Sequence, residues 1–183
     1  MDLNTPGDHA KFPPRTWASQ PSFTEFYASE VKRIVLFVYK NGATWDDAWD
    51  ATQSAFVGSF QRWDGIDDPA KYVRRAALLN YRAQRQRSNE DVRRAAEAKW
   101  IYFPSFDQLK LLDEEKQVLD AIAQLPERQR EVMAWHYDGF SIPEISDLLK
   151  VDAGRVRSNL HLARKKLKET LNENRDWFTG GDK

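Results

Sequence analysis

The sequence predicts an all-α protein made of two small helical domains joined by a linker. Apolar residues recur at spacings of three and four along most of the chain, which is the period of amphipathic helices, and no long segment alternates like a strand. The 183 residues are enough for two domains. Two blocks of net charge +6, residues 71–87 and 153–168, are separated by acidic segments, although the whole chain is neutral. One basic block therefore falls in each predicted domain.

Composition narrows the class of protein further. The chain contains no cysteine, which excludes disulfides and thiolate metal sites and is typical of a reducing compartment. No apolar run reaches the roughly 18 residues of a membrane span, so no membrane insertion is expected. Residues 1–21 lack the apolar core of a signal peptide, and their Pro, Gly and Ser content predicts a flexible tail. A cytoplasmic protein is the expectation.

The first domain is expected over residues 22–87, beginning with two helices. The first helix carries its apolar residues from Phe23 to Val38 and ends at Asn41-Gly42. Thr44 is the expected N-cap of the second helix, with an aspartate three residues later in a capping box. The residues expected on the buried side of the second helix are Trp45, Trp49, Thr52, Phe56, Phe60 and Trp63.

A third helix completes the first domain. Asp64-Gly65 ends the second helix, and Asp68-Pro69 supplies an N-cap followed by proline at the first helical position. The third helix then runs into an arginine-rich stretch near Arg87. Its expected apolar side is Tyr72, Ala76, Leu79 and Ala83. Residues 88–112 are interpreted as a linker, with a short helix before Pro104.

The second domain is expected over residues 113–171, with regular helices resuming near Asp113, followed by a tail over 172–183. Pro126 opens one of its helices, and Asp138-Gly139 ends that helix. Ser141 and Glu144 form a second capping box, which begins a short helix. A tight turn at residues 150–152 leads to a basic helix whose core stripe is Val156, Leu160, Ala163 and Leu167.

Two helices joined by a tight turn, the second of them basic, are typical of a helix-turn-helix that binds DNA in the major groove. Residues 153–168 contain six cations and no acid, as contact with phosphates requires. Forked or short polar side chains near the start of the helix suit base edges. Two solvated helix faces are the alternative explanation of the two basic blocks. The candidate DNA-binding residues are Arg155, Arg157, Ser158, Asn159, His161, Arg164 and Lys165.

Residues 125–169 resemble region four of bacterial RNA polymerase sigma factors, especially those of the extracytoplasmic-function group. The resemblance implies that this domain reads the minus-thirty-five promoter element, with Arg157, Ser158 and His161 reaching bases. Arg155 and Leu162 stand where the family usually has a small hydroxyl residue and a basic residue. The matching positions are Leu125-Pro126-Glu127-Arg128, Glu131-Val132, Tyr137, Gly139-Phe140-Ser141, Glu144-Ile145, Leu148-Leu149, Gly154, Val156, Arg157-Ser158 and Ala163-Arg164-Lys165-Lys166-Leu167.

Residues 22–87 resemble region two of the same family more loosely, through DDAWDATQSAFVGSFQRW and DDPAKYVRRAALLNYRAQRQR. The chain departs from the family at Ser54, Phe60, Tyr72 and Leu79. A response regulator has a similar helix-turn-helix, but its other domain would need strands alternating with helices. No strands are expected in residues 22–87. Asp46, Asp50, Gln53 and Val57 share one face of the second helix, away from its aromatic stripe. The resemblance implies that this helix docks on core RNA polymerase, with Asp50 and Gln53 at the matching positions; a merely solvated acidic face is the alternative.

The resemblance also assigns the minus-ten element, held as a melted strand, to the third helix and the loop before it. Such a site needs aromatic surfaces for stacking and a cationic track. Trp63, Tyr72 and Tyr81 are the aromatic candidates, and both Trp63 and Tyr72 are equally compatible with a core position. Arg74 is an additional cationic candidate. The assigned residues are Arg62, Trp63, Asp64, Lys71, Tyr72, Arg75 and Asn80.

An enzyme is not expected. No two of the three histidines are spaced to share a metal, no phosphate-binding glycine loop is present, and paired aspartates stand at helix starts, where they favour the helix dipole. No catalytic residue, metal or cofactor is assigned. The expected partners are core RNA polymerase and promoter DNA, with an anti-sigma factor as a further candidate. A stand-alone helix-turn-helix regulator and a sigma-like interaction protein without promoter reading are the alternative functions.

Overall fold

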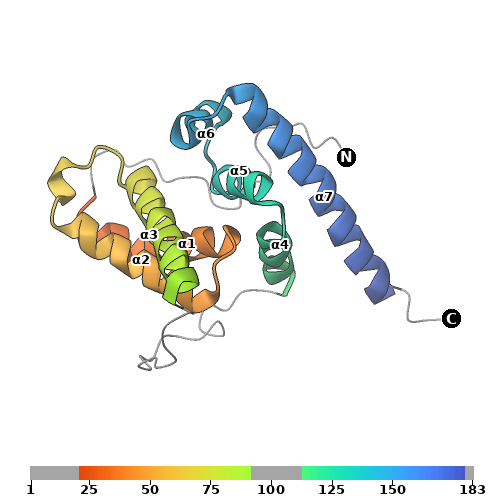
Figure 1. Cartoon of the computed structure of the whole chain (residues 1–183), viewed down its shortest axis with the longest axis horizontal. Helices are drawn as coiled ribbons and strands as arrows, with labels where there is room; N and C mark the ends of the chain where they lie inside the picture. Colours follow the sequence, from red (N-terminus) through yellow and green to blue (C-terminus); the bar gives the residue numbers. More distant parts are fainter. Residues whose placement is uncertain (1–20, 92–112, 180–183) are drawn as a thin grey trace. The chain divides into compact units, whose positions relative to one another are not determined.

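The computed structural model describes residues 21–91 and 113–179. Every α-helix in these ranges was expected from the sequence, and the described residues contain no strand, so the all-α class is confirmed (Figure 1). The described residues fall into two compact units. We call the described residues 21–91 the N-terminal unit and residues 113–179 the C-terminal unit.

Three helices and a short 3-10 turn build the N-terminal unit: α1 (Phe23–Lys40), α2 (Trp45–Phe60), η1 (Trp63–Gly65) and α3 (Pro69–Asp91). Each helix begins at a side-chain cap. The Glu25 backbone amide donates to Ser22 Oγ before α1, and hydrogen bonds from the side chain and backbone of Ser22 lower the pKa of Glu25. Thr44 and Asp68 accept from the amides of Asp47 and Lys71, which confirms both expected caps.

The core of the N-terminal unit lies where α2 packs against α1 and α3. Phe26, Phe37 and Phe56 are fully or almost fully buried there. Phe23 lies edge-on to Phe56, with the ring centroids 6.0 Å apart. These aromatic contacts bury large apolar areas, which is the main stabilising term available to a small helical unit.

Two expectations about the core are wrong. Phe60 is 63% exposed, and the expected apolar side of α3 faces outward, with Leu79 53% exposed. The side of α3 that is buried consists instead of Ala70, Val73, Arg74, Ala77, Leu78 and Tyr81. Small alanines and a paired arginine make up much of this face, so a search for large apolar residues at helical spacing selects the other face.

Four helices form the C-terminal unit: α4 (Asp113–Ala123), α5 (Glu127–Tyr137), α6 (Ile142–Leu149) and α7 (Ala153–Thr179). The other three helices all pack against α7. Trp135 is 1% exposed and lies edge-on to Phe140, with the ring centroids 4.9 Å apart. Pro126 precedes α5, and Gly139 adopts a φ of 92° after it, as the sequence indicated.

Some element ends differ from the expected ones. Helix α3 continues to Asp91 rather than ending near Arg87. Helix α7 continues to Thr179, so a tail from residue 172 is wrong over residues 172–179. Neither end carries a strong stop signal, because no glycine or proline follows Arg87 or Leu171 closely. The short helix expected before Pro104 and the tail over residues 1–20 lie outside the described residues.

Candidate nucleic-acid interface

Helices α6 and α7 form the expected helix-turn-helix. The Ser141 backbone amide and hydroxyl both donate to Glu144 Oε2, at 2.9 and 2.7 Å, which fixes the start of α6. Lys150 ends α6 in the left-handed region, with a φ of 54°. The Ser146 hydroxyl then donates to the Val151 carbonyl at 2.6 Å, which ties α6 to the turn. These local bonds set the direction in which α7 leaves the turn.

Asp152 caps the second helix of the motif. The Gly154 amide donates to Asp152 Oδ1 at 2.7 Å. A Cβ atom at position 154 would also lie 2.7 Å from Asp152 Oδ1, so a larger residue there would displace the capping carboxylate from this position. The first turn of α7 is therefore held in place by the turn that precedes it.

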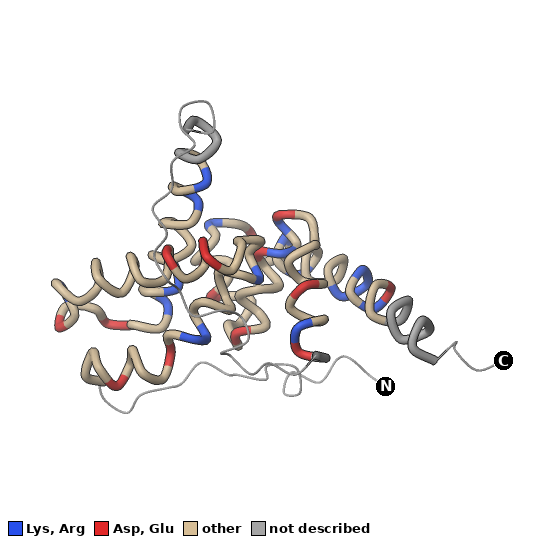
Figure 2. Tube along the Cα trace, turned by 90° about the horizontal axis from the view of Figure 1, so that it is seen from below, with Lys and Arg blue, Asp and Glu red and all other residues tan. Residues whose placement is uncertain are grey.

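Helix α7 has one buried face and one charged face. Val156, Leu160 and Ala163 are buried against the unit, and Leu167 is half-buried. On the other side, the exposed residues among the expected DNA contacts are Arg155, Arg157, Ser158, His161 and Lys165. Lys166 and Lys168 are exposed as well. Figure 2 shows basic positions along α7. An exposed row of cations on a helix supported from behind is suited to entering the major groove of a duplex.

Two of the expected contacts on α7 are engaged within the unit itself. Asn159 is half-buried, and its Nδ2 atom donates to the Arg155 carbonyl at 2.9 Å. Arg164 is also half-buried, and its Nη2 atom donates to His136 Nε2 at 2.8 Å, which ties α7 to α5. Arg164 therefore helps to hold α7 in place, whereas Asn159 bonds within α7 itself, and both are less available to DNA than the exposed residues.

The residues expected at the minus-ten element are not all at the surface. Arg62, Asp64 and Arg75 are exposed, and Tyr72 is 37% exposed. Lys71 is half-buried, with its Nζ atom 3.3 Å from Asp68 Oδ2. The half-buried Asn80 donates to the Ala51 carbonyl at 3.4 Å, which links α3 to α2.

Two aromatic candidates for base stacking lie in the core. Trp63 is 8% exposed, its Nε1 atom donates to the Pro21 carbonyl at 3.0 Å, and its ring lies edge-on to Phe23. Tyr81 is 6% exposed and donates to the Gly42 carbonyl at 2.8 Å. Because a stacked base needs an open ring face, this conformation does not present Trp63 or Tyr81 for stacking. Tyr72 is the one of the three whose side chain is exposed.

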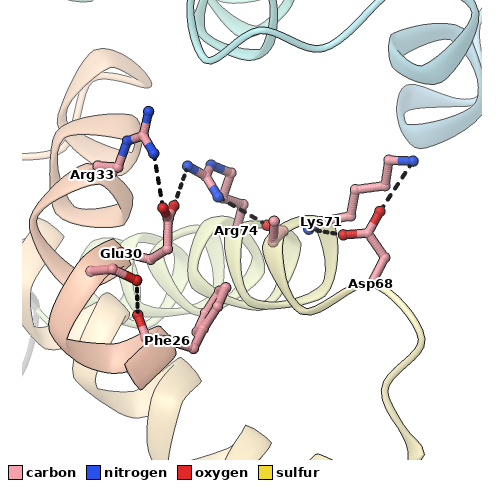
Figure 3. A network of polar contacts seen from close by, with 8 residues as sticks. Phe26, Glu30, Arg33, Asp68, Lys71 and Arg74 are labelled. Carbon is pink, nitrogen blue, oxygen red and sulfur yellow. Dashed lines mark hydrogen bonds and ion pairs between the residues drawn. The ribbon is translucent and has the colours of Figure 1, made fainter. Parts of the chain in front are cut away.

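A buried ion-pair network in the N-terminal unit was missed by the sequence reasoning (Figure 3). Arg74 Nη2 lies 3.0 Å from Glu30 Oε2, and Arg33 Nη1 lies 2.9 Å from Glu30 Oε1. Glu30 and Arg74 are each 1% exposed. Arg74 was expected in the cationic track and is instead a structural residue that joins α3 to α1. No sequence signal distinguishes it from its exposed neighbour Arg75, because the partner is far away in the chain.

The residues expected to bind core polymerase lie on or beside the outer face of α2. Asp46 is exposed and Val57 is 67% exposed. Gln53 is half-buried, and its Nε2 atom donates to the Tyr27 hydroxyl at 3.0 Å. Partial burial raises the pKa of the Asp50 carboxyl, and the charges of Asp47 and Asp46 raise it further. The start of α2 thus gathers negative charge.

Within the described ranges, no group of three His, Asp or Glu side chains is arranged to hold a metal ion. Across the same residues, none of the helices combines the length and apolarity that crossing a bilayer would demand. The fold and the surface of α7 together define an all-α protein with a helix-turn-helix of the DNA-binding type.

Comparison with known proteins narrows this class to a family. Residues 115–167 match the family described as Sigma-70, region 4. The RNA polymerase sigma-E factor of Streptomyces avermitilis is 32% identical over 137 residues, which cover 71% of this chain and 73% of that protein. The protein of the same name from Streptomyces antibioticus is 31% identical over 137 residues, with the same coverage.

Solved structures agree on the fold. The sigma factor RpoE in complex with the anti-sigma factor NepR from Bartonella quintana has a TM-score of 0.62 at 19% identity, covering 82% of this chain and 96% of that chain. CnrH in complex with the cytosolic domain of CnrY has a TM-score of 0.58 at 21% identity, covering 85% and 91%. The chain belongs to the sigma-70 family of RNA polymerase sigma factors, in its extracytoplasmic-function group, and its role lies in transcription initiation.

Proposed function

We propose that this protein binds core RNA polymerase and directs it to promoters through two separate DNA contacts. The C-terminal unit reads the minus-thirty-five element as duplex, and the N-terminal unit holds the minus-ten element as a melted strand. The observation that carries the proposal is the exposed cationic face of α7, which has a buried apolar stripe behind it. A helix built in this way gains affinity from phosphates and specificity from base edges.

Arg157, Ser158 and His161 are the proposed base contacts, and Arg155 and Lys165 are the proposed phosphate contacts beside them. Each of these side chains is exposed on the surface of its unit. An arginine fork matches the two acceptors of guanine, and hydroxyl or imidazole groups can pair with several base edges. Asn159 and Arg164 take a supporting role because both bond within the unit.

For the minus-ten element, we propose that Tyr72 stacks on an extruded base while Arg62 and Arg75 follow the phosphates of the same strand. All three side chains are exposed. A stacked base gains roughly 1–3 kcal/mol, and cations along the strand add a salt-dependent term. Trp63 supports this site from the core, where it fixes η1 against α1.

Core polymerase is the proposed partner of the α2 face. Asp46 and Asp50 supply carboxylates that can pair with arginines on a partner, and Val57 supplies an exposed apolar contact. Because two similar folds were solved with an anti-sigma factor and with a cytosolic domain of a second protein, we also propose an anti-sigma partner for this chain.

Run-off transcription tests the proposal. Purified core polymerase is mixed with the full chain on a library of genomic fragments, and transcripts with defined start sites are expected only when both proteins are present. Tight operator binding without polymerase would instead support a stand-alone helix-turn-helix regulator. Polymerase binding without defined starts would support an interaction protein that no longer reads promoters.

The double variant Asp50→Ala/Gln53→Ala tests the α2 face. We expect weaker pull-down of core polymerase by the variant, with an unchanged helical circular dichroism spectrum. Gln53 also bonds to Tyr27, so the single variant Tyr27→Phe is the control for loss of that bond alone. Normal pull-down by the double variant would contradict the assigned surface.

A further inference from the structure

One apolar side chain interrupts the charged face of α7. Leu162 is 49% exposed. Among the described residues five large hydrophobic side chains are exposed, and Leu162 is the one that belongs to the C-terminal unit. The other four are Val57, Phe60, Tyr72 and Leu79. Among residues 115–171, whose side chains the structure describes, this leucine is therefore the one large apolar side chain that is mostly open to solvent.

The position of Leu162 on the helix places it among the proposed DNA contacts. It follows Ser158 by four residues and precedes Lys165 by three, and residues at these spacings are neighbours on one face of a helix. Both of these neighbours are exposed, whereas the buried stripe of α7 runs along the opposite side. A duplex that accepts Ser158 and Lys165 must also meet Leu162.

A leucine side chain has no donor or acceptor, so it can contribute neither to phosphate binding nor to hydrogen bonds with base edges. The major groove presents one apolar group, the C5-methyl of thymine. Contact between two apolar groups removes both from water, and a methyl-sized contact corresponds to about a fourfold change in affinity, or about 0.8 kcal/mol. The chemistry of Leu162 thus fits a single feature of the groove.

We propose that Leu162 reads a thymine methyl in the minus-thirty-five element and is a specificity-determining residue of this protein. The inference rests on the proposed function, because it requires α7 to lie in the major groove. Ser158 and Lys165 fix the register of the helix, and Leu162 then favours thymine over cytosine at the base pair that it faces. Cytosine has a hydrogen at C5, and its N4 amino group would meet an apolar side chain.

Replacing thymine by uracil removes the C5-methyl and keeps the base-pairing groups, which allows a double-mutant cycle. Holoenzyme is reconstituted from core polymerase and the full chain, and its preferred upstream elements are selected from a random duplex library. Each thymine of the selected element is then replaced by uracil, one at a time. Binding of wild type and of Leu162→Ala is measured on every duplex.

At one position, uracil is expected to weaken wild-type binding about fourfold, and Leu162→Ala is expected to weaken binding to the thymine duplex by a similar factor. The two changes together should cost no more than either alone, because both remove the same contact. Lys165→Ala is the matched control, and uracil should weaken its binding as much as that of wild type. Leu162 is exposed, so the alanine variant is expected to stay folded.

Three results would overturn the inference. The first is that no uracil position affects wild-type binding, and the second is that the effects of uracil and of Leu162→Ala multiply independently. The third is that the wild-type holoenzyme selects no upstream element at all, which would overturn the proposed function and the inference with it. The first two results leave the proposed function intact, so the two failures are distinguishable.

Discussion

The two basic blocks of this chain have the same net charge but differ in how their cations are used within the fold. In α3, Arg74 is fully buried beside Glu30, Lys71 pairs with Asp68, and Arg75 is exposed. In α7, the exposed cations are Arg155, Arg157, Lys165, Lys166 and Lys168, and Arg164 is held by His136. A run of positive charge in the sequence therefore indicates a nucleic-acid surface only through those cations that are not buried or paired within the fold.

The sharpest test of this difference is Arg74→Met. Losing one partner of a buried ion pair typically costs about 3–5 kcal/mol. Because Arg33 would still pair with Glu30 in the variant, we expect the lower end of this range, a loss of about 3 kcal/mol in the free energy of unfolding. Urea unfolding of the full chain, followed by circular dichroism, measures it. Arg75→Met, at the next and exposed position, is the control and should change stability by less than about 0.5 kcal/mol. Equal losses in the two variants would contradict the buried pairing.

The corresponding test of α7 is Arg157→Ala. A forked base contact is worth about 1–3 kcal/mol of discrimination, so we expect the preference for the upstream element to fall by roughly 5-fold to 160-fold, with stability unchanged. Binding of the holoenzyme to matched and mismatched duplexes measures the preference. Weaker binding with unchanged discrimination would assign Arg157 to the phosphates instead.

Salt dependence distinguishes free cations from engaged ones within α7 itself. Lys165→Ala should lower the slope of log affinity against log salt concentration by about 0.9, as expected for the loss of one phosphate contact. Arg164→Ala should lower the slope less, because Arg164 bonds to His136. A titration of duplex binding with potassium chloride provides both slopes. A larger change for Arg164 would show that it turns away from His136 in the complex.

The smallest expected effect concerns the acidic start of α2. Since burial and the neighbouring aspartates raise the pKa of Asp50 in the folded chain, its ionised form is less favourable there than in the unfolded chain. Asp50→Asn should therefore raise stability near neutral pH, by less than about 0.5 kcal/mol for this partly exposed group. The gain in stability should shrink as the pH falls towards about 3.9, which is the pKa of an unperturbed aspartate. Urea unfolding at several pH values checks the trend, and a gain that grows in acid would contradict it.

Local signals in the sequence predicted most of the fold. Ser141 with Glu144, Asp152, Thr44 and Asp68 each cap a helix through bonds spanning two or three residues, so a short stretch of sequence contains both partners. The core stripe of α7 was predicted for the same reason, since apolar residues repeat there at helical spacing. The exposed side of α7 followed from that stripe.

Contacts between distant residues could not be predicted in this way. Arg74 and Glu30 are far apart in the chain, and nothing near either one marks it as buried. Trp63 bonds to Pro21, and Asn80 bonds to Ala51, so two candidate minus-ten residues are engaged by partners that local sequence does not reveal. Leu162 could be recognised in the sequence as an apolar residue on a cationic helix face. It was not selected as a DNA contact, because leucine forms no hydrogen bond or ion pair with DNA.

The central claim is that α7 turns its arginines outward for DNA while α3 keeps Arg74 for the fold. Arginine modification by a dicarbonyl reagent, resolved by mass spectrometry, tests both halves at once in the free chain and in the holoenzyme bound to a selected promoter. We predict that Arg74 stays unreactive throughout, and that Arg155 and Arg157 react in the free chain and become protected on the promoter. Protection of Arg157 in the free chain, or its full reactivity on the promoter, would contradict the account.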